Sequence, residues 1–433
     1  MSPQSKVHLL VLVHGMWGHP GHLAEMARII RETKQQEDAD GVSLHVLLAD
    51  SNRDDSTYDG VDWGGERVAE EVVEEVQKLA ESGKVVTRFS VTGYSLGGLV
   101  SRYLIGVLHQ RNFFKDIVPV NFNTVATPHI GLLRYPSVVS SIFSTLGPRL
   151  LSRTGEQFYC VDKWSATGRP LLEVMADPGR IFYQSLKRFK NIRIYANAIN
   201  DMTVPYPTSA MDATDPFAQA STTGLQVHLN EKYSPLIDSY TLPPTPPELP
   251  PQPTMFSVAW FRSLGPSRPI LPPLLQFRFP FNIVMYLLLP LLIPLFLLMI
   301  IVRFVLATRS SRARIKLLEE HPSREQRLLN ILSLVEKEVE NRIVDLMEEP
   351  SALEGGNGAP AMQAATHKSQ PIISAVQRRI LASLNQLPIK KELAYIPDVR
   401  NSHAIIVCRD VKRFEAHRIG EGVVRHWADS FDL

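Results

Sequence analysis

The chain has 433 residues, a length that corresponds to one large domain or to two or three smaller ones. Hydrophobic residues make up 44% of it and charged residues 21%, a balance that excludes a wholly disordered protein. Lys and Arg number 46 against 44 for Asp and Glu, so no basic field indicates nucleic acid as a partner. The two cysteines, Cys160 and Cys408, cannot build a disulfide framework or a thiolate zinc site.

The amino-terminal residues pass directly into a short apolar run. They lack the charged lead and the small-residue cleavage site of a secretory signal peptide. We therefore expect a protein that is made and kept on the cytosolic side.

Residues 1–240 alternate between strand and helix patterns. The first strand is expected at Leu9–Val13, a continuous apolar run typical of a parallel strand that is buried on both faces. The other elements expected here are strands at 42–48, 85–92, 118–125 and 192–198, and helices at 66–80 and 97–108. This alternation predicts an α/β fold, with a mostly parallel sheet and helices on both of its faces.

A G-x-S-x-G pentad, Gly93 to Gly97, lies between an expected strand and an expected helix. This strand–turn–helix setting is the one that a nucleophile elbow requires, with Ser95 in the turn. Gly93 and Gly97 avoid clashes with the adjoining strand and helix. The amides at the start of the helix can then stabilise an oxyanion, so Ser95 is the predicted nucleophile.

A second glycine-containing loop, His14 to Gly18, follows the first expected strand. Catalytic loops in open α/β sheets lie at the carboxyl ends of the strands. Gly15 allows the backbone to turn its amides inward, and the amides of Met16 and Leu96 are the predicted oxyanion donors. The His14 side chain is expected to brace the loop, because oxyanion binding here needs backbone N–H groups.

Four stretches of the sequence resemble a known family: LVLVHGMWGHPGHL, TYDGVDWGGERVAEEV, VTGYSLGGLVSRYLIG and NTVATPHIG. They are similar to the family named "putative serine esterase" (domain of unknown function 676), and within it to the fungal lipid-droplet phospholipases. The resemblance covers residues 1–240 and resumes at Leu393–Asp410. It implies an α/β-hydrolase fold, acyl-ester hydrolysis on glycerolipids, a Ser–Asp–His triad, no metal and no cofactor.

The triad acid is predicted at Asp201. Partners in this fold follow the chain order Ser…Asp…His, and Asp201 comes almost directly after the strand expected at 192–198. A carboxylate there can orient an imidazole and stabilise its protonated form. Asp212 and Asp215, in the polar loop that follows, are the alternatives.

The triad base has two candidates among the thirteen histidines, since chain order or position sets the others aside. His228 is near Asp201 in sequence. His403 precedes a strand-like run at Ala404–Cys408, and the resemblance favours it because Asn-Ser-His-Ala looks like the family's carboxyl-terminal histidine motif. We expect His403 to be the base, with His228 as the alternative.

A segment of 24 residues, Phe279–Val302, contains no charge and is followed by a cluster of arginines. At about 1.5 Å per residue it is long enough, as a helix, to cross a hydrocarbon core of about 30 Å. Pro290 and Pro294 lie near its middle, so it is expected either to cross or to turn back as a hairpin. A single crossing would place Ser95 and His403 on opposite sides of the membrane, where they could not meet. Either the segment turns back as a hairpin, or His228 is the base.

The predicted organisation has a hydrolase domain interrupted by a membrane-embedded insertion. Residues 1–240 supply most of the hydrolase domain. The segments that follow are a proline-rich linker 241–278, the hydrophobic segment with its basic flank 279–308, an amphipathic region 309–349, a flexible linker 350–371, and the segment 372–433 that completes the hydrolase. The amphipathic region either lies on a membrane or covers the hydrolase domain.

The predicted function is that of a serine lipase or esterase, with a phospholipase as the first candidate. The catalytic domain is expected to face the cytosol at a membrane, at the endoplasmic reticulum or a lipid droplet. One alternative is an inactive hydrolase fold that serves as a membrane adaptor. Another is an anchored esterase or thioesterase for non-lipid esters.

Overall fold

The computed structural model describes residues 5–165, 167–243, 281–320 and 370–433. Their centre is a six-stranded sheet in which every neighbouring pair of strands is parallel. In sheet order the strands are β2 (Val42–Leu48), β1 (Ser5–Val13), β3 (Lys84–Tyr94), β4 (Val118–Val125), β5 (Asn191–Asn197) and β8 (Ile389–Ala394).

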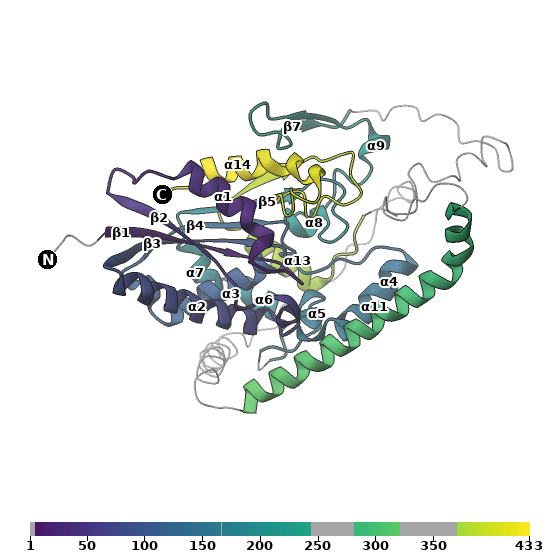
Figure 1. The fold of residues 1–433 in the computed structure, drawn as a ribbon, viewed down its shortest axis with the longest axis horizontal. Helices are drawn as coiled ribbons and strands as arrows, with labels where there is room; N and C mark the ends of the chain where they lie inside the picture. Colours follow the sequence, from purple (N-terminus) through teal and green to yellow (C-terminus); the bar gives the residue numbers. More distant parts are fainter. Residues whose placement is uncertain (1–4, 166, 244–280, 321–369) are drawn as a thin grey trace, which may run out of the picture.

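Helices cover both faces of this sheet (Figure 1). One face packs against α2 (Val61–Glu81), α3 (Leu96–Gln110), α6 (Leu171–Ala176), α7 (Ile181–Lys187) and α13 (Ala375–Leu384). The other packs against α1 (Ala24–Thr33) and α14 (Glu421–Asp429). The predicted α/β architecture is therefore confirmed.

The apolar run of β1 explains why this strand lies inside the sheet. Val7, Leu9 and Val11 pack into the core on one face, while Leu10 and Leu12 pack into the core on the other. A strand that buries both faces has no reason to alternate polar and apolar residues. Its continuous hydrophobicity is thus the signature of its position between two layers of helices.

Shorter elements connect these layers. They are the 3₁₀ helices η1 (Pro20–Leu23), η2 (Asp54–Tyr58), η3 (Phe113–Lys115) and η6 (Glu415–Gly420), the helices α4 (Val138–Leu150), α5 (Ser152–Phe158), α8 (Tyr206–Ser209) and α9 (Ala220–Thr223), and an antiparallel pair, β6 (Gln226–Leu229) with β7 (Ile237–Thr241).

Residues 370–433 return to the α/β domain. They supply β8, which pairs with β5, and α14, which packs on α1 on the far side of the sheet. The run Ala404–Cys408, which looks strand-like in the sequence, does not form a strand. It forms consecutive turns, in which Ile406 N–H donates to Ser402 O and Cys408 N–H donates to Ile405 O. It is apolar because it is buried, and a short buried apolar run looks the same in a strand and in a compact turn.

The apolar segment belongs to one long helix, α11 (Phe281–Glu320), which runs along one side of the α/β domain (Figure 1). The helix passes through Pro290 and Pro294 without reversing, so the expected hairpin is not formed. Each proline removes one helical hydrogen bond, and the turns on either side continue. By length and composition the stretch Leu287–Leu318 qualifies as a candidate membrane span, with a mean hydropathy of 2.7 and an apolar window that is 0% buried.

Most of the expected linkers and much of the amphipathic region lie outside the described residues. Of the region expected at 309–349, residues 309–320 are described, and they continue α11. Of the two linkers, the structure describes only 241–243 and 370–371.

Candidate active site

Ser95 occupies a tight turn between β3 and α3. Its φ of 56° and ψ of −125° are outside the regions that side-chain-bearing residues usually adopt, and its N–H donates to Val125 O at 2.9 Å. The flanking glycines are required by space. A Cβ atom on Gly93 would lie 2.4 Å from Gly97 O, and one on Gly97 would lie 2.1 Å from Val13 O. The pentad thus forms a nucleophile-elbow turn.

His403 lies against this serine. Its Nε2 is 3.0 Å from Ser95 Oγ, although the two residues are 308 positions apart in the chain. Two contacts hold the histidine backbone: Tyr94 OH donates to His403 O at 3.0 Å, and His403 N–H donates to Asn401 Oδ1 at 3.1 Å. The Tyr94 ring also packs on the imidazole at 5.1 Å between ring centroids. The imidazole position is therefore fixed from two sides.

Asp201 follows β5 and contacts the other nitrogen of the same imidazole. His403 Nδ1 lies 2.9 Å from Asp201 Oδ2, which also accepts a hydrogen bond from Asn197 Nδ2 at 2.9 Å. Its Oδ1 accepts from the backbone N–H groups of Thr203 and Val204 at 3.0 and 2.8 Å. With Nδ1–H donating to the carboxylate, Nε2 faces Ser95 Oγ and can accept its hydroxyl hydrogen.

The alternative acids and the alternative base make other contacts. Asp212 accepts a hydrogen bond from Tyr206 OH, Asp215 accepts one from Phe217 N–H, and His228 projects from the exposed pair β6–β7. Within the described residues none of these three side chains hydrogen-bonds to Ser95, Asp201 or His403.

The two predicted oxyanion donors border the serine. The Gly15 backbone lies so close to it that a Cβ atom there would be 2.7 Å from Ser95 Cβ, and Met16 is the next residue. Leu96 is the first residue of α3, where helix N–H groups have no partner within the helix. Across the described ranges, neither the Met16 nor the Leu96 amide is occupied by a hydrogen-bond acceptor.

His14 braces the loop between β1 and η1. The side chain is buried, its Nδ1 donates to Gly15 O at 3.1 Å, and a Cβ atom on Gly18 would lie 2.7 Å from that same nitrogen. Burial lowers the pKa of His14, so the imidazole is neutral at pH 7. This geometry fits the bracing role expected for it.

The same loop is fastened to η2 by Trp17. Its backbone N–H donates to Thr57 Oγ1 at 3.2 Å and its indole Nε1–H donates to Tyr58 OH at 2.9 Å. Phe304 of α11 stacks on the indole with 5.9 Å between ring centroids and 3° between ring planes. The apolar helix therefore touches the loop that carries the Met16 amide.

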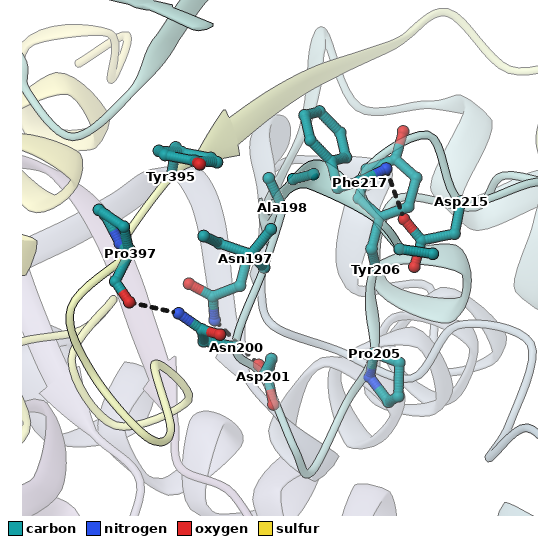
Figure 2. Close-up of a pocket in the computed structure, with 13 residues that line it drawn as sticks. Asn197, Ala198, Asn200, Asp201, Pro205, Tyr206, Asp215, Phe217, Tyr395 and Pro397 are labelled. Atoms are coloured by element: carbon teal, nitrogen blue, oxygen red, sulfur yellow. Dashed lines mark hydrogen bonds between the residues drawn. The ribbon is translucent and has the colours of Figure 1, made fainter. Parts of the chain in front are cut away.

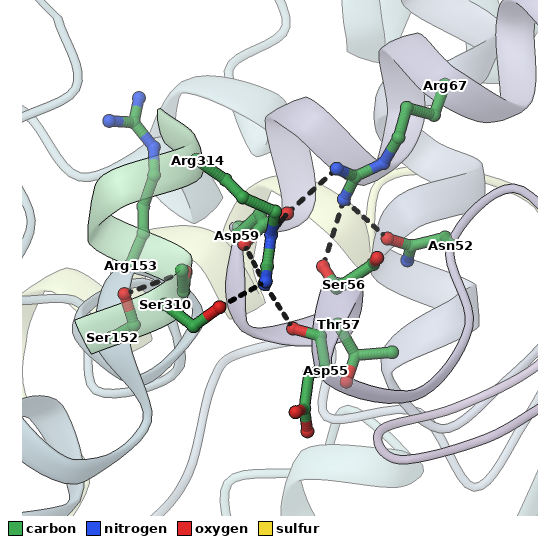
Figure 3. A network of polar contacts seen from close by, with 12 residues as sticks. Asn52, Asp55, Ser56, Thr57, Asp59, Arg67, Ser152, Arg153, Ser310 and Arg314 are labelled. Atoms are coloured by element: carbon green, nitrogen blue, oxygen red, sulfur yellow. Dashed lines mark hydrogen bonds and ion pairs between the residues drawn. The ribbon is translucent and has the colours of Figure 1, made fainter. Parts of the chain in front are cut away.

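A second contact joins α11 to η2 through the buried Asp59 (Figure 3). Its carboxylate pairs with Arg67 at 2.8 Å and with Arg314 of α11 at 2.8 Å. Arg314 also donates to Asp55 O at 2.8 Å, and Arg67 donates to Ser56 O at 2.9 Å. Nothing in the sequence pointed to this network, because Arg314 stands in a basic cluster that is typical of contact with lipid headgroups.

A cavity of about 400 Å³ adjoins the acid (Figure 2). Asp201 lies on its wall together with Tyr206 and Asp215, while Ser95 and His403 are not among its lining residues. Burial raises the pKa of Asp215 to about 6. The cavity therefore adjoins Asp201 and does not include Ser95 or His403.

The parallel sheet, the serine in a strand–helix elbow, and an aspartate and a histidine brought in by later segments define the α/β-hydrolase fold. Residues 3–214 match the family model described as "Putative serine esterase (DUF676)". The chain therefore carries a domain of this family, as the sequence motifs suggested.

Curated relatives align with about half of this chain. "Putative lipase C4A8.10" of Schizosaccharomyces pombe is 30% identical over 239 residues, which cover 53% of this chain and 30% of the relative. "Putative lipase ROG1" of Saccharomyces cerevisiae is 28% identical over 247 residues, which cover 56% of this chain and 34% of the relative. The alignments thus span about a third of the length of these relatives.

Solved structures with similarity include "Phospholipase PlaB from Legionella pneumophila", at 16% identity and a TM-score of 0.23, covering 35% of this chain and 31% of that one. An extracellular alpha/beta-hydrolase from a Paenibacillus species has 17% identity and a TM-score of 0.21, covering 33% of this chain and 51% of that one.

Proposed function

We propose that this chain is a serine esterase that hydrolyses acyl esters of glycerolipids, with phospholipids as the first candidates. The observation that carries the proposal is the pair of contacts made by the His403 imidazole. Its Nδ1 lies 2.9 Å from Asp201 Oδ2, and its Nε2 lies 3.0 Å from Ser95 Oγ. The family domain and the relatives named as lipases support a lipid ester as the substrate.

In the proposed mechanism His403 Nε2 takes the hydroxyl proton of Ser95 as Oγ attacks the ester carbonyl. The amides of Met16 and Leu96 hold the oxyanion, and Asp201 stabilises the imidazolium that forms. His403 then donates this proton to the departing alcohol, leaving an acyl-serine. Water, activated by the same imidazole, releases the fatty acid and restores Ser95. Each step uses only these groups and water, and we expect no cofactor.

The proposed location is a lipid surface that faces the cytosol, at the endoplasmic reticulum or a lipid droplet. The end of α11 belongs to the hydrolase side, since Thr308 Oγ1 donates to Leu150 O at 2.6 Å and Arg314 pairs with Asp59. A full crossing by α11 would oblige residues 244–280, which contain four charged residues, to cross back through hydrocarbon. We therefore propose that α11 enters lipid from one side without crossing it.

The test is a panel of phospholipids, di- and triacylglycerols and short soluble esters, offered to the wild type and to Ser95→Ala. We expect Ser95-dependent release of fatty acid from a glycerolipid class. Turnover of soluble esters or thioesters alone would indicate an anchored non-lipid esterase. A folded wild type that turns over nothing would indicate an adaptor.

A further inference from the structure

Helix α4 has a row of apolar side chains that are exposed among the described residues. Val138 is 77% exposed and Phe143 is 65% exposed, and Ile142 and Leu146 are exposed as well. Val138, Ile142 and Leu146 recur every four residues, which places them on one face of the helix. Single exposed apolar side chains are ordinary, but a row of them on one short helix marks a contact surface.

Helix α4 lies beside α11 (Figure 1). The two helices pack together, and Thr308 Oγ1 of α11 donates to Leu150 O at the end of α4. Just beyond, Ser311 Oγ lies 3.1 Å from Ser152 Oγ. The exposed side chains that make up this two-helix surface are Val138, Ile142, Phe143 and Leu146 of α4, with Leu287, Leu291, Leu295, Leu298 and Val302 among those of α11.

Exposed arginines accompany the two-helix surface. Arg149 stands at the end of α4, and Arg303 and Arg309 follow the apolar stretch of α11. Cations next to an apolar stretch suit a lipid surface, where acyl chains accept the apolar groups and anionic headgroups accept the charges. A protein interface would instead combine its apolar core with a rim of mixed polar groups.

We propose that the two-helix surface inserts into a glycerolipid surface, with α4 as a second lipid-contacting element beside α11. The choice of lipid rests on the proposed function. The exposed stretch of α11 also favours lipid as the partner. It is apolar enough to lie in hydrocarbon, and among the described residues its most apolar part is 0% buried.

Helix α4 is connected to the edge of the sheet that carries Ser95. The chain reaches α4 from the carboxyl end of β4, and on the way Thr127 packs against Gly98 beside the elbow. A Cβ atom on Gly98 would lie 2.1 Å from Thr127 Oγ1, so this connection leaves no gap next to the serine turn. The segment that leads to α4 therefore passes directly beside the serine turn.

The test uses the full chain with a nitrobenzoxadiazole dye on Phe143→Cys. Val118→Cys is the matched control, because Val118 is also apolar and 58% exposed but starts β4 at the opposite edge of the sheet. Burial raises the pKa of both native thiols, Cys160 and Cys408, so the dye reacts at the introduced cysteine. On vesicles of phosphatidylcholine and phosphatidylserine, we expect blue-shifted and brighter emission at position 143 only. The same emission change at both positions, or at neither, overturns the proposal.

A kinetic arm compares Phe143→Glu with Val118→Glu. The ratio of vesicle-lipid hydrolysis to soluble-ester hydrolysis is expected to fall at least about tenfold in Phe143→Glu and to stay at the wild-type value in Val118→Glu. An unchanged ratio in Phe143→Glu contradicts insertion. If the wild type hydrolyses neither substrate while the dye at 143 still shifts, the proposed function fails and the docking surface stands.

Discussion

Asp201 is held in one orientation by the hydrogen bonds around it. Its side chain is 1% exposed, and its two oxygens receive hydrogen bonds from His403, Asn197 and two backbone amides. The carboxylate is fixed in orientation by these contacts and in turn orients the His403 imidazole. Its role is testable because one oxygen can be exchanged for an NH₂ group without a change of shape.

Asp201→Asn is expected to lower kcat on a soluble ester by roughly 10³–10⁴-fold, because an amide donor facing His403 Nδ1 selects the wrong tautomer. The measurement is steady-state hydrolysis, with circular dichroism to show that the variant folds. Asp212→Asn is the matched control and keeps wild-type rates. An Asp201→Asn enzyme within tenfold of wild type would remove this carboxylate from the mechanism.

The three side chains that the structure brings together were easier to predict than the residues that hydrogen-bond to them. Ser95 has a local signature, and chain order with the family resemblance pointed to Asp201 and His403. Tyr94, which binds the His403 carbonyl across 309 positions of sequence, has no such signature. Asn197 was equally invisible, because an asparagine near the end of a strand reads as ordinary sheet polarity.

At the scale of elements, α11 joins two environments in one helix. Its first half is apolar and exposed, while Ala307, Ser311 and Ile315 near its end are buried against the hydrolase domain. Of the two forms predicted for this segment, a crossing helix or a hairpin, the hairpin is not formed, because two prolines near the middle of an apolar run interrupt hydrogen bonds without forcing a reversal. Hydropathy alone gave no sign of where the exposed stretch ends and the docked stretch begins.

Arg314→Ala is expected to lower the free energy of unfolding by about 1–3 kcal/mol, because it removes one of the two cations on the buried Asp59. The partial exposure of Arg314 sets this below the value for a fully buried pair. Urea unfolding of the detergent-solubilised chain measures the change. Arg312→Ala, an exposed neighbour on the same helix, serves as the control. Equal midpoints for the two variants would show that the Asp59 network does not hold α11.

At the scale of the whole molecule, the hydrolase domain is assembled from segments far apart in the chain. Residues 370–433 add β8 to the sheet and carry His403. Their last helix, α14, packs on the face of the sheet to which Leu10 and Leu12 of β1 point. His8 of β1 packs on Phe431 at 5.1 Å between ring centroids. The sequence predicted the return of the chain through the resemblance at 393–410, but the pairing of β8 with β5 is a long-range contact that no local pattern encodes.

The free energy of unfolding is expected to depend on pH through His8, which is buried in this assembly. Burial, followed by the positive charge of Arg88, lowers the pKa of His8 to about 3. The folded state therefore holds a neutral ring, and its contribution is complete above the unfolded pKa of about 6.5. As the pH falls from 6.5 toward 3, each unit costs about 1.4 kcal/mol.

Unfolding free energies at pH 7.5 and pH 5 measure this contribution when the wild type is compared with His8→Gln. Glutamine stays neutral and can still reach Ser90, which His8 Nε2 contacts at 2.7 Å. We expect the wild type to lose roughly 2 kcal/mol more than the variant between the two pH values. Parallel profiles would show that His8 is not buried as a neutral group.

The most direct measurement of the central claim is the rate at which a fluorophosphonate modifies Ser95, read by mass spectrometry of the labelled peptide. We predict a single adduct on Ser95, no adduct in Ser95→Ala, labelling slowed by at least about 10³-fold in His403→Ala, and an unchanged rate in His228→Ala. An adduct that survives in Ser95→Ala, or a His403→Ala protein that labels as fast as wild type, would contradict the account.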